Sequence, residues 1–174
     1  MGEALKKIEV EKSYNPKTFE ERIYDLWLKT SAFTPKDRGA GKTFTIVMPP
    51  PNVTGVLHIG HALDNMLPDI IVRYKRMCGF ETLWIPGEDH AGIATQNVVE
   101  KHLRQEGIDP KAMSRDEFIK KTYALAMEHK KTIQTQLKKM GVSVDWERER
   151  FTMDEASSKA VAEAFCTLYE RGDI

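Results

Sequence analysis

The sequence of 174 residues has few cysteines, no surplus of either charge and no long apolar run. Cys78 and Cys166 lack the spacing of a metal site and are too few for a disulfide scaffold, which indicates a reducing compartment, the cytoplasm. No stretch reaches the roughly 18 apolar residues of a membrane-spanning helix, and residues 1–16 lack the apolar core of a signal peptide. We therefore expect no association with a membrane.

The balance of charge also limits the partners of this chain. Lysine and arginine together number 26, as do aspartate and glutamate, so no overall positive field would attract a polyanion. Lysines between residues 120 and 139 could contact RNA, but acidic residues lie among them, and we interpret them as solvated faces. Strong binding of nucleic acid by this chain alone is therefore not expected.

One part of the sequence predicts a parallel sheet. A strand over 43–48, a helix from near Leu57 to Gly79 and a strand over 81–85 predict a right-handed parallel unit, and hence an α/β fold. Pro68 predicts a kink or break in this helix between Asp64 and Pro68. Ligands of such sheets bind at the carboxyl ends of the strands.

The remaining elements are expected to be mainly helical. Capping boxes of Ser114 with Glu117 and of Thr152 with Glu155 predict the starts of the last two helices. Besides the parallel unit, we expect helices over 16–31, 93–106, 115–139 and 155–172, a loop over 36–42 and a strand-like stretch over 142–146.

The stretch PPPNVTGVLHIGHALDN, residues 49–65, places His58 and His61 three residues apart where a strand gives way to a helix. A helix N-terminus offers unpaired backbone donors and a positive dipole end, so anions bind there readily. Gly60 has no side chain and would let a flat ring such as adenine lie against the backbone. The pattern favours binding of the phosphates of ATP. As a metal pair, the histidines lack a third ligand at supporting spacing.

Three blocks of the sequence resemble the class I aminoacyl-tRNA synthetases, and among these the valyl-tRNA synthetases. The blocks are the stretch 49–65 with its HIGH element at 58–61, LWIPGEDHAGIATQ at 83–96, and DWERERFTMDE at 145–155. HIGH alone is typical of nucleotidyl transfer, whereas Asn-Val-Thr after the prolines and the Asp-His-Ala-Gly run are similar to the valine enzymes. The resemblance extends from Tyr14 to the end of the chain.

The resemblance implies the first half of a Rossmann-like parallel nucleotide-binding fold with additional helices. We expect an N-terminal helix and loop over 1–42, the first half of the nucleotide-binding fold over 43–110, and a helical continuation over 111–174 up to an editing insertion. With sheet partners missing, an open edge and an exposed apolar face are expected. The implied activity is ATP-dependent activation of valine to valyl-adenylate and transfer to tRNA(Val) by a full-length enzyme, which we expect to be a monomer.

The resemblance also implies roles for individual residues. His58 and His61 would be catalytic hydrogen-bond donors to the phosphates. The residues that would contact ATP are Pro51, Asn52, Val53, Thr54, Gly55, His58, Gly60 and His61. Valine would contact Pro50, Asn52 and Asp89, whose carboxylate suits the α-ammonium group. No metal site is expected in the protein itself, because Mg²⁺ would arrive with ATP.

Some residues near these blocks keep a second interpretation. Asp89 could instead cap the following helix. His90 could act in catalysis or support its neighbours. Trp146 and Arg148 could position the rim of the site, although packing in the core explains Trp146 equally well.

Other residues are given structural interpretations. His129 falls on the apolar stripe of its helix and is expected to be packed, whereas His102 is expected to face solvent. The run KAMSR at 111–115 resembles the mobile KMSKS loop of the family, but Ser114 is already explained as a helix cap.

Two rival functions stay open. The chain could be a free-standing nucleotidyltransferase of the HIGH superfamily, although the helical region after residue 115 and the valine-type motifs argue against this. It could also be a non-catalytic fragment that keeps substrate-facing motifs but needs a complementing half.

Overall fold

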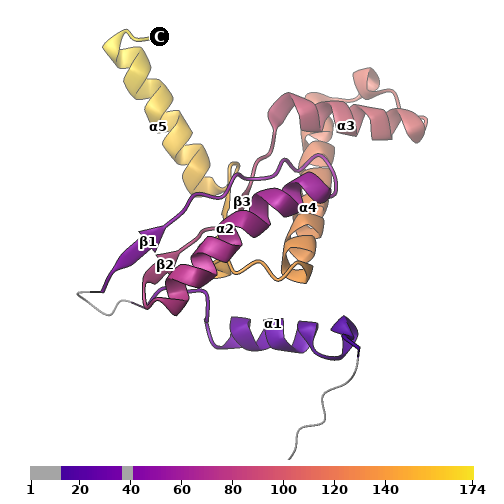
Figure 1. Ribbon diagram of the computed structural model, residues 1–174. Coiled ribbons are helices and arrows are strands. Elements are labelled where there is room, and N and C mark those ends of the chain that lie inside the picture. The colour runs from indigo at the N-terminus through magenta and orange to yellow at the C-terminus, as the bar shows by residue number, and fades with distance from the viewer. Residues whose placement is uncertain (1–12, 37–40) are drawn as a thin grey trace, which may run out of the picture.

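The computed structural model describes residues 13–36 and 41–174. Its elements are η1 (Pro16–Thr18), α1 (Glu20–Lys29), β1 (Thr43–Thr45), α2 (Ile59–Met77), β2 (Glu81–Leu83), β3 (Gly87–Glu88), α3 (Gly92–Gln105), η2 (Pro110–Ala112), α4 (Arg115–Lys139), η3 (Trp146–Arg148), β4 (Arg150–Phe151) and α5 (Glu155–Arg171). The five expected helices are all present (Figure 1). The expected loop over 36–42 lies largely outside the described residues.

The strands are short and parallel, and the pairing of β1 with β2 is the one that the sequence predicts. β1 pairs with β2, with Phe44 opposite Thr82, and β3 pairs with β4. Backbone hydrogen bonds continue this arrangement beyond the strands, from Ile46 N to Leu83 O at 3.4 Å and from Asp145 N to Trp84 O at 2.9 Å. Segment 81–89 therefore runs between segment 43–53 and segment 145–152.

The region 142–152 differs from expectation. Residues 142–145 are buried irregular backbone rather than a strand, and the pairing strand β4 follows a few residues later. β4 contains only Arg150 and Phe151, which is too short for an alternating pattern to be visible in a sequence. Its pairing with Gly87 and Glu88 is set by tertiary contact.

The core lies between the central segment 81–89, α2 and α4. Trp84 and Val53 are fully buried there, and Ile133 and Leu137 of α4 pack into the same cluster. The other buried members are Met48, Val72, Ala126, Val142, Val144 and Phe151. Trp146 is half-buried against this cluster, which favours its packing role over the rim.

Tyr24 of α1 joins two parts of the chain that lie far apart in the sequence. Its hydroxyl donates to Val142 O at 2.8 Å and accepts from Trp146 Nε1 at 2.8 Å. Burial raises the pKa of Tyr24 to about 12, so the phenol stays protonated and keeps donating at neutral pH. α1 is thus fixed to the segment that leads into β4.

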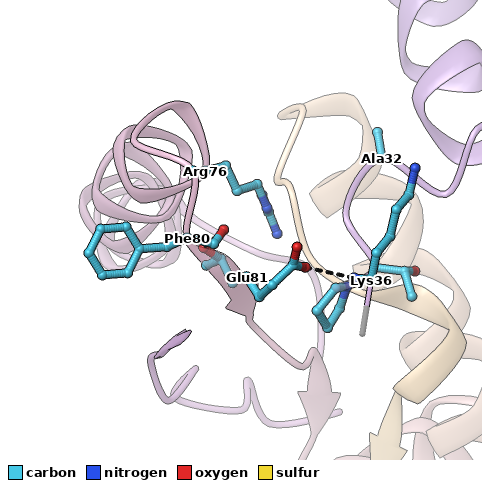
Figure 2. Close-up of a pocket in the computed structure, with 9 residues that line it drawn as sticks. Ala32, Lys36, Arg76, Phe80 and Glu81 are labelled. Carbon is cyan, nitrogen blue, oxygen red and sulfur yellow. Dashed lines mark hydrogen bonds between the residues drawn. The ribbon is translucent and has the colours of Figure 1, made fainter. Parts of the chain in front are cut away.

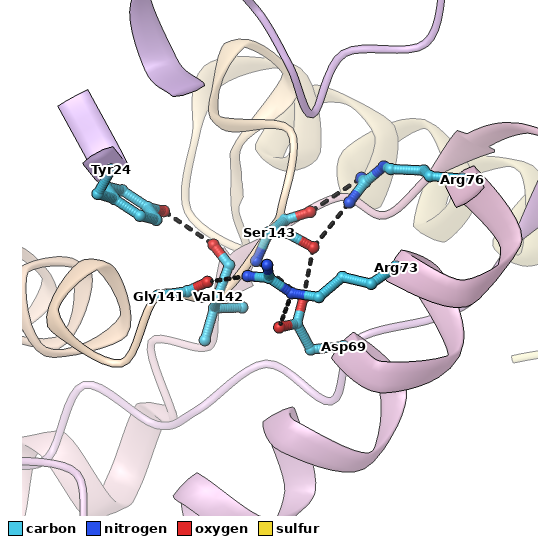
Figure 3. A network of polar contacts seen from close by, with 7 residues as sticks. All are labelled: Tyr24, Asp69, Arg73, Arg76, Gly141, Val142 and Ser143. Atoms are coloured by element: carbon cyan, nitrogen blue, oxygen red, sulfur yellow. Dashed lines mark hydrogen bonds and ion pairs between the residues drawn. The ribbon is translucent and has the colours of Figure 1, made fainter. Parts of the chain in front are cut away.

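Polar side chains of α2 hold the segment 141–143 (Figure 3). Arg73 Nε contacts Asp69 Oδ2 at 2.7 Å, and Asp69 Oδ1 accepts from Ser143 N at 3.0 Å. Arg76 Nη2 donates to Ser143 O at 2.9 Å, while Arg73 Nη2 reaches the carbonyl of Gly141. The face of α2 that turns inward is therefore largely polar.

The opposite face of α2 carries the apolar stripe that predicts this helix, and it is exposed. Its exposed members are Ile59, Leu63, Met66, Leu67, Ile70, Ile71, Tyr74 and Met77. In Figure 1, α5 extends away from the other elements, and all of its residues are exposed or half-buried. The expected exposed apolar face is thus present on α2.

Of the kink or break expected near Pro68, the break is wrong, because α2 continues through Pro68. The kink stays a prediction. Pro68 has no N–H to donate to the carbonyl of Asp64, but Asp64 is exposed, so water can satisfy that carbonyl. No helix among the described residues is long and apolar enough to span a membrane.

The two expected capping boxes have different outcomes. Ser114 and Glu117 form the predicted box at the start of α4. The box of Thr152 with Glu155 is wrong, because Asp154 is the N-cap of α5 and accepts from Ser157 N at 2.7 Å. The hydroxyl of Thr152 is engaged elsewhere, next to β3.

Candidate functional site

His58 and His61 form the start of α2. His58 is the N-cap, and its Nδ1 accepts from Gly60 N at 3.1 Å. His61 Nδ1 accepts from His58 N at 3.2 Å. A neutral ring whose Nδ1 accepts a hydrogen bond carries its proton on Nε2. Both rings therefore keep an Nε2–H donor for a ligand at the helix N-terminus.

Gly60 leaves room for the ring of His58. A Cβ at residue 60 would lie 2.9 Å from His58 Cε1 and 3.0 Å from His58 Nδ1. A side chain there would push the imidazole out of its capping position. The adenine contact that the sequence predicts for Gly60 stays a prediction. The structure gives a separate reason for glycine at this position, the packing of the His58 ring.

The segment Pro50–Val53 approaches the second motif through its backbone. Val53 N donates to Asp89 O at 2.9 Å, and Asp89 N donates to Pro51 O at 2.9 Å. Burial alternates along the segment, with Pro51 and Val53 buried and Pro50 and Asn52 exposed. Asn52 and Asp89 are bridge partners in a parallel ladder, so their side chains lie on the same, open side.

α4 supports this segment from the buried side. His129 Nδ1 lies 2.9 Å from Val53 O, and Gln136 Oε1 accepts from Leu57 N at 2.8 Å. His129 and Gln136 are seven residues apart and share one helix face with the fully buried Ile133. His129 is half-buried, as expected of a packed histidine, and His102 is exposed as expected. The hydrogen bonds themselves carry no signal in the sequence.

Thr54 and Gly55, which follow Val53 in the same loop, are half-buried.

Asp89 has partners from its own turn and from Thr152, the residue that follows β4. Its Oδ1 accepts from Ala91 N at 3.0 Å and lies 3.3 Å from the hydroxyl of Thr152. The side chains of Asp89 and His90 are each 39% exposed. The N-cap of α3 is Ala91, so Asp89 is not the cap of that helix. Its carboxylate stays accessible for a cationic group of a ligand.

Behind Asp89, the side chain of Glu88 in β3 is a buried carboxyl. Glu88 is 1% exposed, and burial, reinforced by the nearby Glu149, raises its pKa to about 8. Lys130 Nζ lies 2.8 Å from Glu149 and 3.9 Å from Glu88. Among the described residues, neither carboxyl oxygen of Glu88 has a hydrogen-bond partner of its own. Burial thus favours the protonated form of Glu88 at neutral pH, beside the contact of Lys130 with Glu149.

A hollow of about 200 Å³ lies at the far end of α2 (Figure 2). Arg76, Phe80 and Glu81 line it, together with Ala32 and Lys36 from the segment after α1. α2 has 19 residues, so at about 1.5 Å per residue it separates this hollow from His58 by roughly 28 Å. The hollow is thus no part of the HIGH segment. Among the described residues, no group of three or more His, Cys, Asp or Glu side chains could hold a metal ion.

The family of the chain follows from comparison with known proteins. The model of the family described as tRNA synthetases class I (I, L, M and V) matches residues 22–174. This chain therefore belongs to the class I tRNA synthetases. Within that class, its curated relatives include the valine--tRNA ligase of Treponema denticola, which is 61% identical over all of this chain and 19% of the relative.

Other comparisons agree. The valine--tRNA ligase of Treponema pallidum is 48% identical over 99% of this chain and 20% of its own length, and that of Clostridium perfringens is 52% identical over 93% and 18%. The chain thus spans about a fifth of the length of these relatives. A LeuRS of Agrobacterium radiobacter K84, solved with tRNA and LeuAMS, matches 92% of this chain and 19% of its own at a TM-score of 0.76 and 20% identity. That likeness confirms the expected Rossmann-like α/β fold.

Proposed function

We propose that this chain forms one wall of the valine-activation site of a valine--tRNA ligase. It would bind valine and MgATP where segment 50–53, the start of α2 and the end of β3 meet. The division into 1–42, 43–110 and 111–174 belongs to this proposal. The observation that carries it is the backbone bridge between Asn52 and Asp89, which joins two motifs that lie 37 residues apart in the numbering.

Valine activation places a specific demand on the site. As the valine carboxylate attacks the α-phosphorus of ATP and pyrophosphate leaves, negative charge grows on the phosphate oxygens. Donors aimed at that charge lower the barrier more than tight binding of ATP would. His58 and His61, whose Nδ1 atoms are held by backbone N–H groups, would be such donors through Nε2–H. The backbone of residues 51–55 and Gly60 would border the nucleotide, and Mg²⁺ would enter as the counter-ion of its phosphates.

The amino-acid end of the site rests on Asp89. An ionised carboxylate can hold the α-ammonium group through a charge-assisted hydrogen bond. Pro50 and Asn52 lie on the same exposed side of the backbone bridge and would border the valine side chain. A pocket for so small a side chain separates substrates that differ by one methylene by only ~1–3 kcal/mol.

The later steps require parts outside this chain. Transfer of the valyl group to tRNA(Val), by a cytoplasmic and monomeric enzyme, is proposed for the full length of the relatives. The interspersed charges of this chain would give it little affinity for tRNA alone.

The proposal is tested by the thermal unfolding of this chain with sulfamoyl analogues of valyl-, isoleucyl- and threonyl-adenylate, and with ATP alone. A ligand at ~100 times its dissociation constant adds ~2.7 kcal/mol, which raises the unfolding temperature by about 5–10 °C in a chain of this size. A shift selective for the valyl analogue is expected. A shift indifferent to the amino acid would favour a free-standing nucleotidyltransferase, and no shift would favour a fragment that needs a complementing half.

A further inference from the structure

We propose that Thr152 is a positioning residue that joins Asp89 and His90 into one unit and thereby sets the direction of the Asp89 carboxylate. The proposal deepens the proposed function, on which it rests, because it assigns to the third sequence block a task at the amino-acid end of the site.

The hydroxyl of Thr152 contacts both neighbouring residues of the second motif. Its Oγ1 accepts from His90 N at 2.9 Å and lies 2.5 Å from His90 Nδ1. The same oxygen lies 3.3 Å from Asp89 Oδ1. The backbone of Thr152 is fixed independently, because its N–H donates to Glu88 O at 3.2 Å. The hydroxyl is therefore held in place by the pairing of β3 with β4.

The three contacts indicate which ring nitrogen of neutral His90 carries the proton. A hydroxyl has one proton to donate and two lone pairs with which to accept. All three contacts are satisfied together when Thr152 donates to the carboxylate of Asp89 and accepts from His90 N–H and from a protonated His90 Nδ1. If Nδ1 carried no proton, it would compete with Asp89 for the single hydroxyl proton. The geometry thus selects the Nδ1–H form of His90, the reverse of the form found at His58 and His61.

Asp89 is oriented by this arrangement at one oxygen. Oδ1 accepts from Ala91 N at 3.0 Å and from the Thr152 hydroxyl. Both donors bind the same oxygen, so Oδ2 is left for the ammonium group of the amino acid. Local helix capping does not account for the hydroxyl of Thr152, because Asp154 supplies the N-cap of α5.

The test compares Thr152→Val, which removes the hydroxyl and keeps the shape, with Thr152→Ser, which keeps the hydroxyl. Thr135→Val is the matched control, because the hydroxyl of Thr135 is exposed and donates to Lys131 O within its own helix. Nitrogen-15 NMR of the ring of His90 is recorded with rising pH until the neutral form is reached. We expect neutral His90 to carry its proton on Nδ1 in the unsubstituted chain, in Thr152→Ser and in Thr135→Val, and to lose that preference in Thr152→Val.

Affinity for the sulfamoyl analogue of valyl-adenylate is measured on the same four proteins. A hydrogen bond to a charged group contributes ~1.5–3 kcal/mol, so Thr152→Val should weaken binding roughly tenfold or more, and Thr152→Ser should bind like the unsubstituted chain. An unchanged His90 ring in Thr152→Val would overturn the proposal, as would unchanged affinity. If His90 responds as expected but the unsubstituted chain binds no valyl analogue, the link through Thr152 is supported and the proposed function is what fails.

Discussion

The two halves of the candidate site are held in place in different ways. At the start of α2, the rings of His58 and His61 bond to backbone two or three residues away. Just after β3, Asp89 and His90 both contact the hydroxyl of Thr152, more than 60 residues further along the chain. The first half is therefore built by local sequence, whereas the second half also requires contacts with distant segments, among them the pairing of β3 with β4.

This difference predicts which substitutions affect chemistry and which affect stability. Changes at the start of α2 should impair catalysis while leaving the fold nearly intact. Changes around β3 should destabilise the fold and impair the site as a consequence.

The largest effect is expected at the histidines. The measurement uses a chimera in which this chain replaces the stretch that it matches in the Treponema denticola enzyme. His58→Ala or His61→Ala should slow valine-dependent ATP–pyrophosphate exchange by about 10²–10³-fold, because one donor to the transition state is lost. Valine binding should change little. The free energy of unfolding of the isolated chain should fall by only ~1 kcal/mol when the N-cap residue His58 is replaced. An unaltered exchange rate in both variants would show that the histidines have no catalytic role.

The next effect concerns pH and the buried carboxyl of Glu88. Its pKa rises from 4.5 to about 8 on folding, so the folded state binds the proton more tightly than the unfolded state does. The free energy of unfolding should therefore fall as the pH rises from about 5 to 8, by on the order of 3 kcal/mol. Glu88→Gln is uncharged and should lose this slope, becoming more stable than the parent at pH 8 but not at pH 5.

Denaturant titrations at several pH values check this effect of Glu88. Glu128→Gln, an exposed change on α4, serves as the control and should keep the pH slope of the parent. Parallel pH curves for the parent chain and Glu88→Gln would show that Glu88 ionises normally in the folded state.

A third prediction tests the pairing of β3 with β4. A Cβ on Gly87 would lie 2.9 Å from Arg150 O, a backbone atom that cannot move without shifting the strand. Gly87→Ala should destabilise the chain by about 1–3 kcal/mol. At Gly55, a Cβ would meet no described atom within 4 Å, so Gly55→Ala should stay within ~0.5 kcal/mol. Equal urea midpoints for the two variants would contradict the tight strand contact.

The smallest effect is expected for the hydrogen bond from His129 of α4 to the carbonyl of Val53. His129→Phe keeps a flat ring but removes the donor to Val53 O, which should cost about 1 kcal/mol in urea unfolding. His102→Phe, at an exposed position of α3, should be neutral. If both variants unfold at the same midpoint, the bond from His129 to Val53 contributes nothing to the loop.

The same division explains how much the sequence predicts. Helix spacing and the Ser114 capping box are local signals, and the structure confirms the five helices and the parallel pairing of β1 with β2. β4 and the role of Thr152 depend on contacts between distant segments, and the sequence predicts Thr152 wrongly as part of a capping box. A residue that fits a local motif can thus be engaged by a distant partner.

α2 shows a second limit of sequence reasoning. Its apolar stripe predicts the helix, yet the residues that turn inward include Asn65, Asp69 and Arg76, which bond to backbone or to segment 141–143. The spacing of apolar residues predicts a helix with one apolar and one polar face, but it does not predict which of the two faces is buried in this chain.

The most direct test of the central claim is a structure of this chain with the sulfamoyl analogue of valyl-adenylate. The predicted result is a single ligand whose ammonium group contacts Asp89 while its sulfamoyl group contacts His58 and His61. A ligand that engages only one of these groups, or one bound in the hollow beside Arg76, would contradict the claim that the two motifs form one site.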